Sequence, residues 1–197
     1  MPRSVSVRGT KQVVTRWPAP MPRPYQPSLL RLLHGVTALL VPLAWLTGLQ
    51  VYSAHDARFG RLPFSLPGDW IDLHGTVGVL LWPVALLFAL YAIGPGQARL
   101  RQPANALALL ALALAVGSGK LMDENWLRDG QLHHLAYGIH LLAWLLIALA
   151  VALHGASVLR RGGWPLARSM ASLQLRPGDL PANWWDQIRR SFKNRKP

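Results

Sequence analysis

The stretch 131-QLHHLAYGIHLLAWLLIALAVALHG-155 decides the fold of this chain. An α-helix needs about 20 apolar residues to cross a hydrocarbon core of roughly 30 Å, and this stretch is long enough. Yet it carries four histidines: His133, His134, His140 and His154. An imidazole is costly to bury without a partner. These rings therefore predict ligands or hydrogen-bond partners inside a membrane domain.

Three more apolar stretches of similar length precede this one. The four predicted spans cover residues 28–52, 73–93, 104–121 and 132–159, and each is bounded by charge or by proline and glycine. NALALLALALAVG, residues 105–117, lacks the polar face that a helix of a soluble bundle needs. We therefore predict an all-α, integral membrane, four-helix transmembrane bundle in a lipid bilayer, with a soluble bundle as the alternative.

The rest of the chain divides around this bundle. Residues 1–27 are predicted to form a basic, proline-rich cytoplasmic arm, without a cleavage site for a signal peptide. Residues 28–160 form the predicted four-helix domain, and residues 161–197 a basic, tryptophan-containing cytoplasmic tail. The segment NWWDQIRRSFKNRKP at the end of the tail predicts a short interfacial helix, with contact to a cytoplasmic partner as the alternative.

The charges set the predicted orientation in the membrane. The arm through Arg31 has six Lys/Arg, the connection at 94–103 has two, and the tail from Arg160 has nine, against only two acids in these regions. The other two connections hold four Lys/Arg against six acids. The positive-inside rule therefore places both termini in the cytoplasm. This topology also explains the net charge of +13, so no nucleic-acid partner is predicted.

Cysteine is absent from the chain. This excludes disulfides, thiolate metal sites, cysteine-ligated iron–sulfur clusters and covalent haem attachment. Any cofactor must therefore be held non-covalently by other ligands, and histidine is the obvious candidate.

Helix spacing places four histidines at two depths. His140 and His154 are 14 positions apart, so their side chains leave nearly the same face of one helix with a rise of about 21 Å between them. His34, early in the first span, matches the depth of His154, and His74, which opens the second span, matches that of His140. Two b-type haems with paired axial histidines would satisfy all four rings.

These residues have other interpretations. A lone intramembrane histidine often forms a hydrogen bond or joins a proton relay. Zinc is a poor alternative, because a structural zinc site needs four ligands. Gly48 reaches the depth of the outer haem and lets the macrocycle approach the backbone, or simply packs helices. Arg31, one turn before His34, would neutralise a haem propionate or only set topology.

The remaining histidines are predicted at the outer side of the membrane. His133 shares the face of His140, which makes it a rival axial ligand, although a haem at the membrane rim would be half exposed. His133 or His134 would otherwise serve a quinol site or an outer propionate. His55, in the first outer connection, is expected to be solvated.

The quoted motifs RLLHG…LTG, DLHGTVG and LAYGIHLLAWLLIALAVALHG resemble the bacterial cytochrome b561 superfamily. This group includes the di-haem cytochrome b subunits of membrane-bound nickel–iron hydrogenases and formate dehydrogenases. The resemblance covers roughly residues 28–160. It implies a protein of the bacterial inner membrane, and it implies axial haem ligands at four positions, namely His34, His74, His140 and His154.

The resemblance implies transmembrane electron transfer through two haems b, between membrane quinone or quinol and a redox partner protein. Whether the chain is itself an enzyme stays open, since a stand-alone quinol or superoxide oxidoreductase is the alternative and a non-redox scaffold is a third. For the quinone, the sequence slightly favours the outer end, with donors at His133, His134, Asp72 and Tyr137. The cytoplasmic alternative uses arginines, namely Arg31, Arg160 and Arg161.

Overall fold

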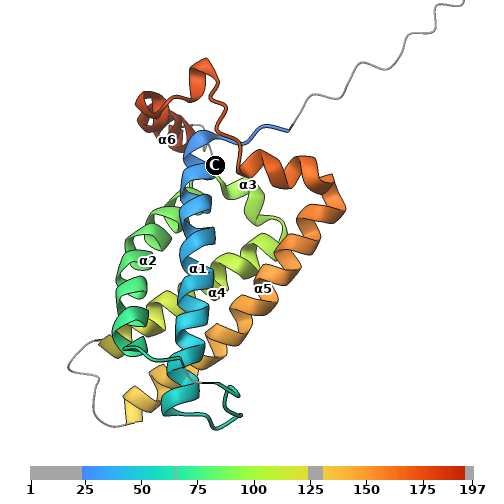
Figure 1. The fold of residues 1–197 in the computed structure, drawn as a ribbon. Helices are drawn as coiled ribbons and strands as arrows, with labels where there is room; N and C mark the ends of the chain where they lie inside the picture. Colours follow the sequence, from blue (N-terminus) through green and yellow to red (C-terminus); the bar gives the residue numbers. More distant parts are fainter. Residues whose placement is uncertain (1–23, 65, 124–130, 194–197) are drawn as a thin grey trace, which may run out of the picture.

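Four long helices form the body of the molecule (Figure 1). The computed structural model describes residues 24–64, 66–123 and 131–193. The long helices are α1 (Ser28–His55), α2 (Trp70–Ile93), α4 (Pro103–Asp123) and α5 (Gln131–Met170). Each is long and apolar enough to cross a membrane. The structure thus confirms the predicted four-helix bundle, and the helices begin and end within a few residues of the predicted spans except at the end of α5.

The two ends of the bundle differ. One end, called the terminal end here, carries the start of α1, the short helix α3 (Gln97–Leu100) and the tail (Figure 1). The tail contains the 3-10 turns η2 (Pro177–Asp179) and η3 (Pro181–Asn183) and the helix α6 (Trp184–Lys193). The opposite, distal end carries the connection of residues 56–69, the end of α4 and the start of α5.

The small core lies where α2 packs against α4. The closest neighbours are α4 with α5 and α1 with α2, while α1 and α5 touch more sparsely. Leu81, Ala85 and Leu112 form the buried cluster between α2 and α4. In contrast, large apolar side chains such as Leu39 and Val79 are more than 60% exposed. Such an apolar exterior suits contact with lipid, since a water-facing helix needs a polar face.

Helix α5 continues past the predicted span end at residue 159. It runs to Met170 through a kink at Gly163, whose φ of 58° lies in the left-handed region that glycine tolerates. Pro165 follows two residues later, where its ring removes a further helical hydrogen bond. The kink turns the last part of α5 across the terminal end of the bundle (Figure 1).

The tail is anchored to the start of α1 by Asp179. The carboxylate of Asp179 accepts a hydrogen bond from the Ser28 backbone N–H at 2.6 Å and one from the Tyr25 hydroxyl at 2.5 Å. The Trp184 indole N–H donates to the Ser28 hydroxyl at 2.8 Å. Asp179 therefore acts as the N-cap of α1 from 151 residues away, where Pro27 offers no side-chain cap.

Candidate functional site

Two pairs of histidines face each other inside the bundle. His34 of α1 and His154 of α5 form the terminal pair, with ring centroids 6.1 Å apart and planes inclined by 41°. His74 of α2 and His140 of α5 form the distal pair, with centroids 6.0 Å apart and planes inclined by 74°. The structure thus brings together the four histidines in the pairs that helix depth predicts, while their binding of iron stays a prediction.

The spacing within each pair suits one metal ion held between two rings. An imidazole nitrogen binds a transition metal at about 2 Å and itself lies about 1 Å from the ring centroid, so two opposed ligands place their centroids roughly 6 Å apart. No cluster of three or more metal-binding side chains occurs among the described residues. Two imidazoles per site are too few for structural zinc, but they are what the iron of a b-type haem requires of the protein.

Side chains from neighbouring helices hold the distal rings. Nδ1 of His74 lies 3.1 Å from the Thr47 hydroxyl of α1. Nδ1 of His140 lies 3.0 Å from the Ser118 hydroxyl and 3.1 Å from the Ala115 carbonyl oxygen, both of α4. Because Nδ1 is engaged in each ring, Nε2 is the nitrogen available to a metal, and such an outer partner is usual for a ligating histidine.

The terminal pair is held differently. Nδ1 of His154 lies 2.9 Å from the amide oxygen of Asn105, on α4. The amide nitrogen of Asn105 donates to the Arg99 carbonyl at 2.8 Å, which orients the oxygen towards the histidine. His34 instead packs edge-on against the Phe88 ring, with centroids 6.3 Å apart. The two pairs therefore differ in both ring inclination and hydrogen bonding.

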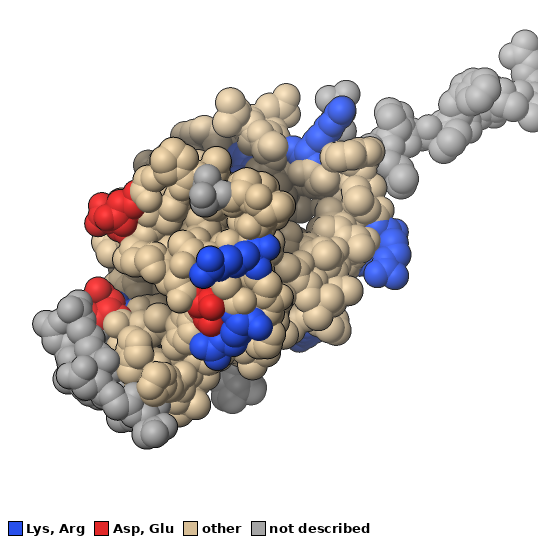
Figure 2. Space-filling model, turned by 60° about the horizontal axis from the view of Figure 1, so that its bottom comes forward, with Lys and Arg blue, Asp and Glu red and all other residues tan. Residues whose placement is uncertain are grey.

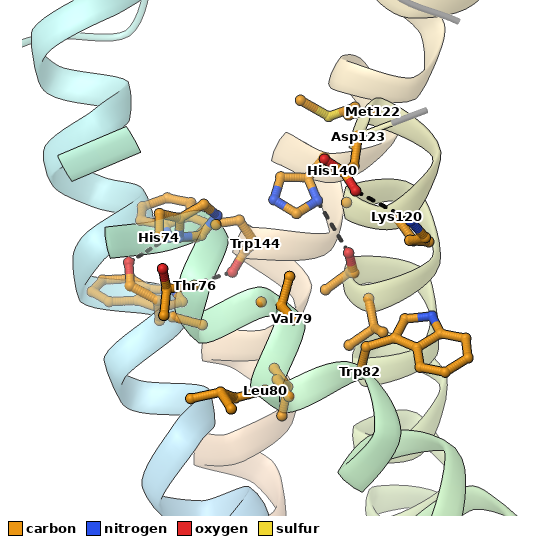
Figure 3. Close-up of a pocket in the computed structure, with 18 of the residues that line it drawn as sticks. His74, Thr76, Val79, Leu80, Trp82, Lys120, Met122, Asp123, His140 and Trp144 are labelled. Carbon is orange, nitrogen blue, oxygen red and sulfur yellow. Dashed lines mark hydrogen bonds and ion pairs between the residues drawn. The ribbon is translucent and has the colours of Figure 1, made fainter. Parts of the chain in front are cut away.

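A cavity of about 760 Å³ adjoins the distal pair. His74, His140 and Trp144 all line it (Figure 3). At its mouth, Lys120 and Asp123 of α4 form an ion pair at 3.1 Å. The volume lies in the range of cofactor and ligand pockets, so this space fits a bound group.

A smaller cavity of about 300 Å³ adjoins the terminal pair. Its walls include both rings, Val158 of α5, and Trp164 and Met170 from the part of α5 beyond the kink. The part of α5 beyond residue 160, which was predicted to belong to the tail, therefore lines this cavity and covers it from the terminal end.

Gly48 and Arg31 each approach protein groups outside their own helix. A Cβ atom at Gly48 would lie 3.0 Å from Cε1 of His74, so this glycine makes room for the imidazole, and its contact with a macrocycle stays a prediction. Arg31 is buried, and its terminal nitrogens donate to the carbonyls of Ser172 and Gln174 in the tail. Its Nε is buried and has no hydrogen-bond partner among the described residues. Contact between this atom and a haem propionate stays a prediction.

The other three histidines lie outside the pairs. His133 is not opposite His74; its ring instead contacts that of His134, with centroids 6.2 Å apart. The Nδ1 atom of His133 is buried and has no hydrogen-bond partner among the described residues. His55 is exposed, as expected from its place at the end of α1.

A polar cluster ties the distal connection to α5. The Tyr137 hydroxyl donates to Asp56 at 2.6 Å, and Arg58 pairs with the same carboxylate at 2.8 Å. Hydrogen bonds from Arg58 and then Tyr137 hold the pKa of Asp56 below its ordinary value. Tyr137, predicted as a quinone donor, thus already donates its proton. Figure 2 shows this end of the molecule, where acidic and basic side chains stand among uncharged ones.

The sequence interpretation missed three residues of the site: Thr47, Ser118 and Asn105. Their signal was present, because each is a polar side chain inside an otherwise apolar span. In a membrane such a side chain seeks a partner on its own or a neighbouring helix. A residue-by-residue search for hydroxyl and amide groups in the spans would have identified them as candidates, though not their partners.

Comparison with known proteins places the chain in a family. Searches of curated proteins and of solved structures found no match to the chain. The family model described as prokaryotic cytochrome b561 matches residues 25–172, which include the four long helices and all four paired histidines. Because this match spans well over half of the 197 residues, the chain belongs to the prokaryotic cytochrome b561 family.

Proposed function

We propose that this chain carries electrons across the membrane through two non-covalent b-type haems. Membership of the cytochrome b561 family supports membrane electron transfer through haem b. The proposed number of two haems rests on the two histidine pairs, whose ring centroids are 6.1 Å and 6.0 Å apart. Haem b held by such a histidine pair would supply one-electron transfer between its ferrous and ferric states.

The side chains around each pair serve this chemistry in stated ways. Nε2 of His34, His154, His74 and His140 would bind iron. The apolar walls of the bundle exclude water from the rings, and the two pairs lie at two depths, about 21 Å apart by the helix rise between residues 140 and 154. Such a pair of sites spans most of a hydrocarbon core of about 30 Å.

Haem content and paired substitutions test this proposal. Pure full-length protein should contain two haems per chain by the pyridine haemochrome assay. His34→Ala and His154→Ala should each remove one and the same haem, and His74→Ala and His140→Ala the other. One haem per chain in well-loaded protein, or loss of a shared haem in His34→Ala and His140→Ala, would contradict it.

We further propose that membrane quinol binds at the distal end of the bundle. Asp72 lines the large distal cavity, and the buried Nδ1 of His133 is without a partner among the described residues. At the other end, two nitrogens of Arg31 are committed to tail carbonyls. Quinol oxidation releases protons, so an end that offers a carboxylate and an imidazole as proton acceptors suits this reaction.

Quinol-driven haem reduction distinguishes the two ends. We expect it to slow in Asp72→Asn and in the double variant His133→Ala/His134→Ala, with both haems retained. If reduction is unchanged in these variants but lost in Arg31→Ala, the quinone binds at the terminal end instead.

The redox partner is proposed as a protein that docks on this membrane subunit. The short distal connection of residues 56–69 favours a second candidate, a stand-alone quinol or superoxide oxidoreductase, because it offers little surface for a large partner.

Affinity purification from membranes distinguishes the subunit from the stand-alone enzyme. A stable stoichiometric partner supports the subunit, and turnover by the isolated chain supports the enzyme. A colourless preparation from haem-replete cells would support a scaffold.

The proposed orientation is that of the inner membrane with both termini in the cytoplasm, so the terminal end faces inward. The positive charge of residues 94–103 and of the tail supports this, as does the acidic composition of the two distal connections.

A further inference from the structure

Both distal histidines meet the same local arrangement, a hydroxyl residue followed by a glycine. Thr47 and Gly48 of α1 face His74, while Ser118 and Gly119 of α4 face His140. The two dipeptides lie on different helices, and each supports a ring that comes from another helix. We call Thr47–Gly48 and Ser118–Gly119 the two cradles.

The hydroxyl of each cradle must accept the hydrogen bond from its imidazole. The Thr47 hydroxyl lies 2.8 Å from the Leu43 carbonyl oxygen and donates to it. The Ser118 hydroxyl donates in the same way to Leu114, at 2.6 Å. A hydroxyl has a single proton, so once it is donated along the helix only lone pairs remain for the histidine. The contact therefore requires a proton on Nδ1 of the imidazole and leaves the lone pair on Nε2.

The glycine of each cradle sets how closely the ring can approach. A Cβ at Gly48 would lie 3.0 Å from Cε1 of His74, and one at Gly119 would lie 3.2 Å from Cε1 of His140. Both distances are shorter than ordinary van der Waals contact. Any larger residue would push the ring away from the hydroxyl and change its inclination.

We propose that the two cradles are positioning devices for the distal haem ligands: Thr47 selects the Nδ1–H tautomer of His74, and Ser118 does so for His140 together with the Ala115 carbonyl. Gly48 and Gly119 fix the ring planes. This rests on the proposed function. A ligand that donates its second N–H becomes a stronger base at the metal-binding nitrogen. The cradles therefore stabilise the ferric state of the distal haem, whereas the terminal pair uses one amide, Asn105, on one ring.

The hydroxyl role is tested by near-isosteric substitution in full-length, haem-loaded protein. Thr47→Val should raise the midpoint potential of the distal haem and move its low-spin EPR signal. Ser118→Ala should do so less, because the Ala115 carbonyl still accepts from His140, and the double variant should do so most. The terminal haem should keep its potential and signal. The conservative variants Thr47→Ser and Ser118→Thr should keep the parental midpoint potential and EPR signal, because they keep the hydroxyl.

The glycine role has matched controls on the same helices. Gly48→Ala and Gly119→Ala should shift the distal EPR signal or release the distal haem. Gly35→Ala on α1 and Gly117→Ala on α4 should leave the distal EPR signal unchanged, because a Cβ at either position meets no protein atom within 4 Å.

The outcomes separate this proposal from the one on which it rests. A parent protein without two bis-imidazole haems refutes the proposed function before any cradle variant is made. If the parent has both haems and Thr47→Val/Ser118→Ala leaves the distal potential and EPR signal at parental values, the cradles do not position the ligands. Should Thr47→Val lose the distal haem, retention by Thr47→Ser supports the hydroxyl role, and loss in Thr47→Ser as well refutes it.

Discussion

At the scale of single residues, the two histidine pairs differ in ring inclination. The distal planes are inclined by 74° and the terminal planes by 41°. The distal rings are each held by a hydroxyl, whereas the terminal pair has the Asn105 amide on His154 and the Phe88 ring against His34. Two sites built from the same ligand type therefore have different electronic surroundings.

This difference predicts two separate low-spin EPR signals. When two axial imidazole planes approach a right angle, the iron orbitals that interact with them become closer in energy, and the largest g value rises. We expect the larger value for the distal haem. Spectra of His74→Ala and His34→Ala protein would assign the signals, since each variant should retain only one. A larger g value from the haem that survives His74→Ala would contradict the assignment.

At the scale of helices, a pair of indoles joins α1 to α5 between the two histidine pairs. Trp45 and Trp144 stack with centroids 4.6 Å apart and planes 8° from parallel. Each indole N–H donates to the backbone carbonyl of the other residue at 3.1 Å. Because α1 and α5 touch sparsely elsewhere, this stack is expected to set the spacing between the helices that carry His34 and His154.

A double-mutant cycle measures the stack. Trp45→Leu and Trp144→Leu should each destabilise the bundle, and the two should be coupled by about 0.5–1.5 kcal/mol, the range for aromatic pairs beyond their buried area. The unfolding free energy in a detergent titration is the measurement. Trp185→Leu on α6, a residue 65% exposed, should combine additively with Trp45→Leu. Additive effects of Trp45→Leu and Trp144→Leu would show that the stack contributes nothing specific.

The tail element depends on one carboxylate. Asp179 is only 7% exposed. Burial raises its pKa, but hydrogen bonds from Tyr25 and Ser28 outweigh this and hold the pKa below the ordinary value. A carboxyl group whose pKa is lower in the folded than in the unfolded protein stabilises the fold at pH values above its unfolded pKa of about 3.9. This contribution is lost as the pH falls through the pKa of the folded state. The tail should therefore stay docked at neutral and mildly acidic pH.

Removal of this carboxylate should release the tail. Asp179→Ala leaves the buried Ser28 N–H without its acceptor, which costs about 1–3 kcal/mol. We expect a lower melting temperature and faster tryptic cleavage after Arg176. Asp186→Ala is the matched control, because Asp186 is exposed on α6. Equal cleavage rates in Asp179→Ala and parent protein would show that Asp179 does not anchor the tail.

At the scale of the whole molecule, the absence of cysteine allows a direct test of orientation. Arg61→Cys introduces a thiol in the distal connection, and Arg101→Cys introduces one at the terminal end. With both termini in the cytoplasm, a membrane-impermeant maleimide added to cells with a permeabilised outer membrane should label only Arg61→Cys. Arg101→Cys should react after lysis. The reverse pattern would invert the proposed topology and with it the side of the quinol site.

The sequence by itself determined the four spans, the two depths of the histidines and their pairing. The physical reason is that helix periodicity fixes the face and depth of residues on one helix, such as His140 and His154, and membrane thickness fixes span length. The same regularity did not place the end of α5, because the helix continues past the apolar span through the kink at Gly163 to Met170.

Only the tertiary structure decided which groups surround the histidines. The partners Thr47, Ser118 and Asn105 lie on helices other than those of their histidines, and their positions depend on how each helix is rotated and placed beside its neighbours. The same holds for Asp179, which caps a helix 151 residues earlier in the chain. Contacts between helices are set by side-chain packing in three dimensions, which periodicity along one helix does not encode.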